Sequence, residues 1–205
     1  MTSRRGEFLT PGMSVGLMGG SFNPAHEGHL HVARMCIRAL GLDRVWWLVS
    51  PQNPLKSARD MAPLEKRLES ARAIAADENR ITVTDIETRL NTRYTIDTIT
   101  ALKKRYPGVR FVWLMGADNM LQLPHWAKWR DIATSLPIAV YPRPGYTLKA
   151  RLSPAAELLR PVTIEASDAP LLPSLTAPAL VFLQGREHSA SATAIRARNG
   201  THPAS

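Results

Sequence analysis

The chain has 205 residues, 44% of them hydrophobic and 21% charged, which is enough for one globular domain that buries its own core. Its only cysteine, Cys36, excludes an internal disulfide and a zinc site built from several cysteines, and it favours a reducing compartment such as the cytoplasm. The 26 Lys and Arg against 17 Asp and Glu give a net charge of +9, which suits phosphorylated ligands, nucleic acid and acidic membranes alike.

The first dozen residues lack the apolar core of a signal peptide, and we expect residues 1–12 to form a flexible tail. The longest strongly apolar run, Val45–Val49, has the length of a strand and falls far short of the ~20 residues that cross a bilayer. The sequence therefore predicts a soluble, cytoplasmic protein with one domain over residues 13–205 and no membrane partner.

Apolar runs of strand length alternate with amphipathic segments of helix length. The first unit is a strand at 15–18, a helix at 30–40 that Gly41 closes, and a strand at 45–49. Further helices are expected from Pro63 and over about 95–106, and further strands at 81–83, 111–115, 137–141 and 180–183, with an irregular connection at 160–178. Uninterrupted apolar strands are typical of a parallel sheet covered on both faces, so the predicted class is α/β, doubly wound.

Residues suited to binding phosphate follow the first predicted strand. Gly19 and Gly20 allow the main chain to approach a phosphate closely, and His26 and His29, three residues apart at a helix start, can point to the same side. In a parallel sheet, ligands bind at the carboxyl ends of strands, where helix N-termini favour anions. The segment matches neither a Walker loop nor G-x-G-x-x-G, so it predicts a phosphate site of another kind.

Less specific readings of the histidines remain open. His26 or His29 could simply cap the helix or bond a loop carbonyl. A zinc site with His31 is disfavoured because no cysteine supports it and because His29 and His31 do not share a helix face, so we expect His31 at the surface.

Two separated motifs give the sequence a family resemblance. Gly19–His29 and Ser191–Arg196 resemble the H-x-G-H and S-x-T-x-x-R signatures of the nucleotidyltransferase superfamily. Within it, further segments resemble the bacterial nicotinate mononucleotide adenylyltransferases: Pro51–Lys56, Tyr94–Thr95, Met115–Asn119, Pro124–Trp126 and Arg143–Tyr146. The resemblance covers about residues 14–198 and implies a Rossmann-like nucleotidyltransferase fold; Asn23 stands where this family usually has Asp.

The resemblance implies transfer of the adenylyl group of ATP to nicotinate mononucleotide, forming nicotinate adenine dinucleotide and pyrophosphate. It implies Mg²⁺ carried by the ATP phosphates and no dedicated metal residue. The implied catalytic residues are His26, His29 and Arg196. Those implied to bind nicotinate mononucleotide are Asn23, Tyr94, Thr95 and Trp126, and those implied to bind ATP are Gly19, Gly20, Ser21, Phe22, Lys56, Gly116, Asp118, Arg143, Ser191 and Thr193.

Each assignment has a plainer alternative. Lys56 could be an exposed loop lysine, Asp118 a helix cap, and Ser191 a plain N-cap beside a solvated Arg196. Trp126 could pack in the core like Trp46, Trp47 and Trp113, and Arg143 could lie in a turn held by prolines.

Two other functions compete with the adenylyltransferase. One is a sibling transferase that acts on another phosphate monoester. The other is a nucleic-acid-binding module, which the lack of interleaved aromatic and basic residues disfavours, so we expect no nucleic-acid partner. The sequence leaves a homo-oligomer open.

Overall fold

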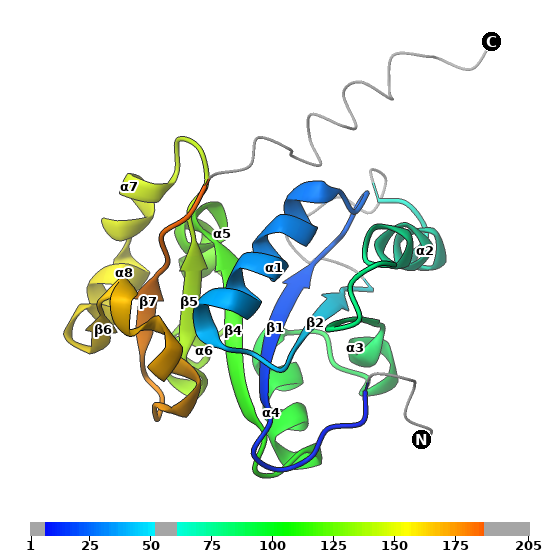
Figure 1. Cartoon of the computed structure of the whole chain (residues 1–205), viewed down its shortest axis with the longest axis horizontal. Coiled ribbons are helices and arrows are strands. Elements are labelled where there is room, and N and C mark those ends of the chain that lie inside the picture. Colours follow the sequence, from blue (N-terminus) through cyan, green and yellow to red (C-terminus); the bar gives the residue numbers. More distant parts are fainter. Residues whose placement is uncertain (1–6, 52–60, 187–205) are drawn as a thin grey trace.

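The computed structural model describes residues 7–51 and 61–186. These residues build one seven-stranded sheet in which all neighbouring strands are parallel, with the strand order β3-β2-β1-β4-β5-β7-β6 (Figure 1). The strands are β1 (Ser14–Gly20), β2 (Arg44–Val49), β3 (Ile81–Thr84), β4 (Arg110–Gly116), β5 (Ile138–Tyr141), β6 (Thr163–Ile164) and β7 (Leu180–Phe182). The predicted doubly wound α/β class is confirmed.

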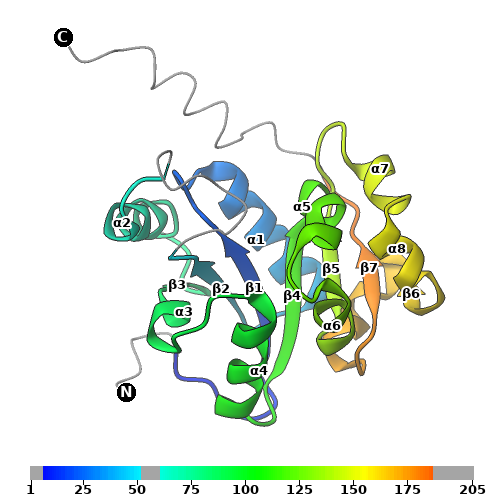
Figure 2. The same ribbon diagram turned by 180° about the vertical axis from the view of Figure 1, so that it is seen from behind.

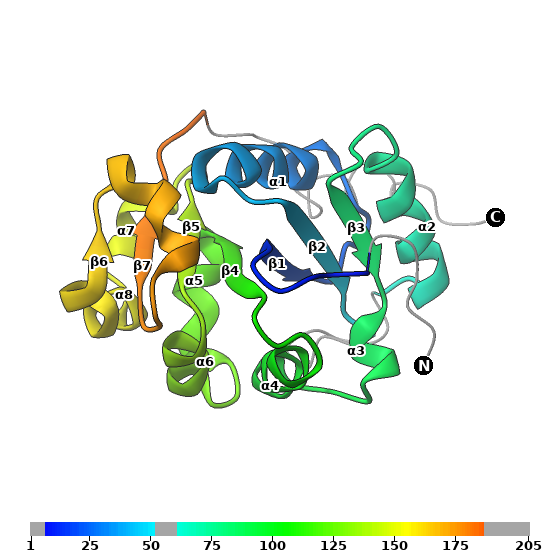
Figure 3. The ribbon, with the colours of Figure 1, turned by 60° about the horizontal axis from the view of Figure 1, so that its bottom comes forward.

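Helices cover both faces of the sheet. On one face lie α1 (Glu27–Leu40), α2 (Leu64–Ile74) and the 3₁₀ segment η4 (Ala166–Ser174) (Figure 1). Figure 2 shows the other face, covered mainly by α4 (Thr95–Arg105), α5 (Ala117–Gln122) and α6 (Trp129–Ser135). Shorter helical segments are α3 (Ile86–Arg89), η2 (Leu123–His125), α7 (Thr147–Arg151), α8 (Pro154–Leu159) and η3 (Arg160–Val162). The view in Figure 3 places the sheet between the two helical layers.

Each helical layer closes a separate apolar core. Along β2, Trp47 and Val49 face the α1 layer, whereas Trp46 and Leu48 face the α4 layer. Since both faces of the strand are buried, apolar residues occupy consecutive positions instead of every second one. This explains why the central strands could be identified from continuous apolar runs.

The boundaries of α1 follow from its sequence. Its buried positions include Leu30, Ala33, Ile37 and Leu40, the spacing of one helix face. Gly41 ends the helix in a left-handed conformation, with φ +63°, and its N–H donates to the Ile37 carbonyl. The predicted C-terminus of this helix is confirmed.

Three features differ from the prediction. Residues 7–9, assigned to a flexible tail, pack on the domain: Leu9 joins a core, and the buried Glu7 carboxylate accepts from Thr84 and pairs with Arg89. The connection at 160–178 contains β6 and η4. The short helices α3, α5, α6, α7 and α8 were not predicted, because four to seven residues show too little periodicity.

The strand register brings the predicted site segments to one edge. Gly20 at the end of β1 lies beside Val49 of β2, and Gly116 at the end of β4 lies beside Tyr141 of β5. The loops that follow these strands therefore leave the sheet side by side. Within residues 7–51 and 61–186, no helix has the length and apolar character needed to cross a bilayer.

Candidate active site

The two predicted catalytic histidines cap helix α1 reciprocally. The Gly28 N–H donates to His26 Nδ1 at 3.1 Å, and the His26 N–H donates to His29 Nδ1 at 3.2 Å. The imidazole centroids lie 3.9 Å apart. This is a capping box made of two histidines, so the helix-capping alternative is correct, and it brings the two rings together.

The cap determines which nitrogen of each ring carries the proton. Because Nδ1 of both His26 and His29 accepts a main-chain N–H, a neutral imidazole at either position must carry its proton on Nε2. In the neutral form each ring therefore donates a hydrogen bond from Nε2–H. Both rings lie at the N-terminus of α1 and at the carboxyl edge of the sheet. Capping and phosphate binding use different nitrogens and are compatible.

The Phe22 side chain packs against the His29 ring. Phe22 has a positive φ of 46° and is 2% exposed. The ring stacks on Trp47 with centroids 5.1 Å apart and contacts the His29 ring at 4.8 Å. The buried Phe22 side chain therefore anchors the loop. The main chain of the loop is then the part that a nucleotide could contact.

Asn23 ties the same loop to the start of α2. Its Oδ1 accepts the N–H of Ala62 at 3.2 Å. A carboxylate oxygen could accept the same bond, so this structural task does not require an amide at position 23.

Ser21 carries a buried hydroxyl whose hydrogen-bonding capacity is unused among the described residues. The residue is 7% exposed, and its Oγ has no hydrogen-bond partner in the described part of the chain. Buried polar groups usually have partners because an unsatisfied one costs about 1–3 kcal/mol. A phosphate oxygen at the end of β1 would supply the acceptor.

A second set of residues predicted to bind ATP follows strands β4 and β5. Arg143 Nε lies 3.4 Å from Asp118 Oδ1, and the two side chains remain 19% and 29% exposed. A Cβ on Gly116 would overlap Asp118 Oδ1 and lie 3.1 Å from Arg143 Nε, so glycine makes room for this ion pair. Helix α5 begins after Gly116 without a side-chain cap, so the alternative that Asp118 caps it is wrong.

Trp126 is linked to the glycine loop through Trp113. The Trp126 ring meets Trp113 edge to face, with centroids 6.3 Å apart, and a Cβ on Gly19 would lie 2.9 Å from the Trp113 ring. Trp46, Trp47 and Trp113 are buried, as predicted, whereas Trp126 is only partly buried, against the core that contains Trp46 and Trp113.

Tyr94 and Thr95 begin helix α4, with Tyr94 as the residue before its first turn. The turn is held by a network that the sequence did not predict. Thr98 Oγ1 donates to Glu87 Oε1 at 3.3 Å and lies 2.8 Å from Thr92 Oγ1. Burial raises the pKa of Glu87 to about 7, although the hydrogen bond from Thr98 acts in the opposite direction.

The structure also identifies Arg67, which sequence reasoning missed. This arginine of α2 is 2% exposed and donates four hydrogen bonds to main-chain carbonyls, three of them just after β1 and β2 and the fourth just ahead of α2. In the sequence it belongs to a charged helical stretch and looks like a solvated residue. The only signal was its position four residues before the buried Ala71, a helical spacing that does not distinguish a buried arginine.

His31, expected at the surface, is half-buried, and its contacts across the fold were not predicted. Its Nε2 lies 3.1 Å from Tyr141 Oη and 2.8 Å from the Arg186 carbonyl, and its ring packs edge to face on Tyr141. It joins α1 to β5 and to the chain that follows β7. Of the other predicted residues, Lys56, Ser191, Thr193 and Arg196 lie outside the described residues.

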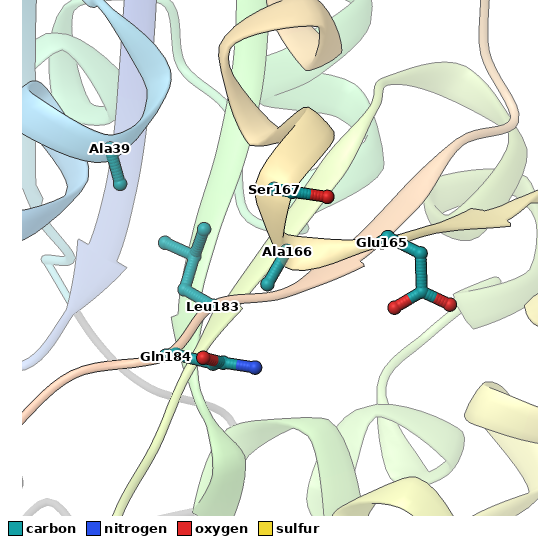
Figure 4. Close-up of a pocket in the computed structure, with 6 residues that line it drawn as sticks. All are labelled: Ala39, Glu165, Ala166, Ser167, Leu183 and Gln184. Carbon is teal, nitrogen blue, oxygen red and sulfur yellow. The ribbon is translucent and has the colours of Figure 1, made fainter.

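A pocket of about 360 Å³ lies elsewhere in the fold (Figure 4). Figure 4 shows its lining from the C-terminal half of α1, the start of η4 and the chain after β7. The lining residues are Ala39, Glu165, Ala166, Ser167, Leu183 and Gln184, none of which was predicted to bind substrate. Among the described residues, no group of three or more His, Cys, Asp or Glu is placed to hold a metal ion.

A parallel sheet with a glycine-containing loop and a helix N-terminus at its carboxyl edge is typical of nucleotide-binding α/β proteins. The sequence model of the cytidylyltransferase-like family matches residues 17–198. The chain belongs to this family.

Close relatives share nearly the whole chain. A protein of Parvibaculum lavamentivorans named "Probable nicotinate-nucleotide adenylyltransferase" is 71% identical over 196 residues, which cover 96% of this chain and 97% of the relative. A protein of Ruegeria pomeroyi with the same name is 50% identical over 193 residues, covering 94% and 90%.

The fold is also found in a solved structure. That structure is a Plasmodium falciparum nicotinic acid mononucleotide adenylyltransferase complexed with NaAD, with a TM-score of 0.70 and 15% identity. The match covers 90% of this chain and 83% of that one. At this identity the likeness concerns the fold.

Proposed function

We infer that the protein is a nicotinate-nucleotide adenylyltransferase, which joins ATP and nicotinate mononucleotide into nicotinate adenine dinucleotide and pyrophosphate for NAD biosynthesis. The relative that is 71% identical over 96% of this chain bears that name. The observation in the structure that carries the inference is the histidine pair of α1 at the carboxyl edge of a parallel sheet, where both Nδ1 atoms accept main-chain N–H groups and each neutral ring therefore carries its proton on Nε2.

The reaction requires little covalent chemistry from the protein. A phosphate oxygen of nicotinate mononucleotide forms a bond to the α-phosphorus of ATP, and the bond from that phosphorus to the oxygen bridging to the β-phosphorus breaks. The attacking oxygen is already anionic, so alignment and stabilisation of charge are sufficient. His26 and His29 donate from Nε2 to the oxygens on which negative charge builds up.

We propose the following division of the other residues. The main chain of Gly19–Phe22 and the Ser21 hydroxyl lie against the triphosphate, and Asp118 with Arg143 contacts the adenosine. The first turn of α4, at Tyr94 and Thr95, and the face of Trp126 receive the nicotinate group, with Asn23 at the boundary between the substrates. Lys56, Ser191, Thr193 and Arg196 bind the β- and γ-phosphates and the leaving pyrophosphate.

Mg²⁺ fits this site as a partner of the substrate. Its preferred ligands are phosphate oxygens and water, so it needs few protein ligands, and one described carboxylate near the predicted nucleotide site, that of Asp118, pairs with Arg143. Carried by ATP, it would neutralise charge on the triphosphate. We further propose a cytoplasmic location and a single nucleotidyltransferase domain that includes the packed residues 7–9 as well as residues 13–205.

Pyrophosphate release tests the function directly. Purified protein with ATP and Mg²⁺ is assayed with nicotinate mononucleotide, its amide and phosphopantetheine. Release with the pyridine nucleotides supports the proposal, and release only with phosphopantetheine identifies a sibling transferase. If none is turned over and salt-sensitive nucleic-acid binding survives His26→Ala, the function is that of a nucleic-acid-binding module.

A further inference from the structure

Arg67 joins three segments that converge beside the histidine pair. Its Nη1 donates to the carbonyls of Ser21, after β1, at 2.8 Å and of Ser50, after β2, at 2.7 Å. Its Nη2 donates to Pro51 at 3.0 Å, and its Nε donates to Ala62, ahead of α2, at 2.9 Å. A single side chain thus holds together the two central strand ends and the start of the next helix.

The partners of Arg67 are unusual for a buried cation. All four acceptors are main-chain carbonyls, and none of the ion pairs among the described residues includes it. Burial lowers its pKa, but a guanidinium remains charged in proteins. Four of its five N–H groups are used in a fixed planar fork, which the three donors of a lysine cannot reproduce.

The bonds made by Arg67 bear on the geometry of the site. Ala62 is held on both sides of its main chain, by Arg67 at its carbonyl and by Asn23 at its N–H. Ser21 precedes Phe22, whose ring lies between Trp47 and His29. A shift of the Ser21 carbonyl would therefore move Phe22, and with it the ring that supports His29.

We propose that Arg67 is a positioning residue for the adenylyl transfer, which rests on the function proposed above. It fixes the main chain at Ser21 against that at Ser50 and Pro51, and so determines where His26 and His29 direct their Nε2–H donors. Arg67 itself contacts neither substrate. Its positive charge, which no described carboxylate neutralises, also adds to the attraction of the site for the triphosphate.

Three variants test this role. Arg67→Lys keeps the charge and loses the fork, Arg67→Met loses both, and Arg72→Met is the matched control on the same helix, where Arg72 forms an exposed ion pair with Glu65. We expect Arg67→Lys to lower kcat roughly 10- to 100-fold while KM for nicotinate mononucleotide changes less than about threefold, because misplaced donors act on the transition state. Arg72→Met should keep wild-type kcat.

A second readout does not depend on activity. Long-range ¹H–¹⁵N spectra of the imidazoles distinguish Nδ1 acceptors from Nε2–H donors, and we expect the His26 and His29 signals to shift in Arg67→Lys and to stay unchanged in Arg72→Met. If the wild type forms no dinucleotide, the proposed function fails, and these spectra still decide the role of Arg67.

Three outcomes overturn the proposal. Wild-type kcat and unchanged histidine signals in Arg67→Lys would show that the fork does not position the site. Loss of kcat in proportion to the folded fraction, measured by thermal unfolding, would leave Arg67 a purely structural role. The same conclusion follows if Arg67→Lys does not fold.

Discussion

Two parts of the predicted site are held in different ways. After β1 and β2, the polar groups are fixed by main-chain bonds: the imidazoles by the cap of α1, Asn23 by Ala62, and the strand ends by Arg67. After β4 and β5, Asp118 and Arg143 form a 3.4 Å ion pair, and both side chains are partly exposed. The first part is arranged before a ligand arrives, and the second can rearrange around one.

This contrast fits the different roles that we propose for the two parts of the site. Donors that stabilise a transition state gain most from being fixed in advance, because no reorganisation is needed during reaction. Asp118 and Arg143, which we propose to contact the adenosine, can exchange partners on binding at small cost because both side chains are partly exposed. Substitutions should therefore change kcat in the first part and KM for ATP in the second.

The largest effect is expected at the histidines. His29→Ala removes an Nε2–H donor and should lower kcat about 100-fold with little change in either KM. For His26 the two roles can be separated: His26→Ala also loses the helix cap, worth ~1 kcal/mol, whereas His26→Asp retains an acceptor for the Gly28 N–H. Steady-state kinetics of His29→Ala, His26→Ala and His26→Asp measure kcat and KM, and thermal unfolding of the same variants measures the stability lost with the cap. Wild-type kcat in His26→Asp would contradict the donor role.

A smaller effect is expected at Gly116. In Gly116→Ala the new Cβ would force Asp118 and Arg143 apart, so KM for ATP should rise about fivefold at unchanged kcat. Stability should change little, because the displaced atoms belong to side chains at a partly exposed position. Arg143→Lys, which keeps the charge without the planar fork, is the companion variant. An unchanged KM for ATP in both would remove this pair from the nucleotide site.

The smallest effect concerns Glu87, beside the turn at Tyr94. Its pKa is about 7 in the folded protein against 4.5 for the free group, so the folded state holds the proton more tightly. Its contribution to stability is therefore greatest below pH 4.5 and is lost as the pH rises through about 7. Glu87→Gln, which keeps an acceptor for Thr98, should gain a few degrees in Tm relative to wild type at about pH 8 and almost nothing at about pH 5.

The control for this prediction is Glu157→Gln. Glu157 is 65% exposed and pairs with Arg160 at the surface, so its removal should leave the pH profile of Tm as in the wild type. Parallel profiles for Glu87→Gln and wild type would show that the buried carboxyl does not titrate near neutral pH.

Much of the fold could be read from local patterns. The five central strands and the helices at 27–40, 64–74 and 95–105 have continuous apolar runs or a clear helical period. The helices α6, α7 and α8 were not predicted, because each is shorter than two turns and shows no regular apolar stripe along one face. The burial of Leu9 was not predicted either, because a Phe8-Leu9 pair in a short polar segment does not reveal that Leu9 is buried while Phe8 stays 75% exposed.

What the sequence by itself determined is the alternation of strands and helices, the place of the glycine and histidine motif after β1, and the resemblance that its motifs carry. These follow from spacings of a few residues. The tertiary structure alone decided that Nδ1 of both imidazoles accepts a main-chain N–H, that His31 bonds across the fold to Tyr141, and that Arg67 reaches Ser21 from 46 residues away. A hydrogen bond between distant segments depends on where the whole chain places its main-chain carbonyls, and no local pattern of residue types encodes that position.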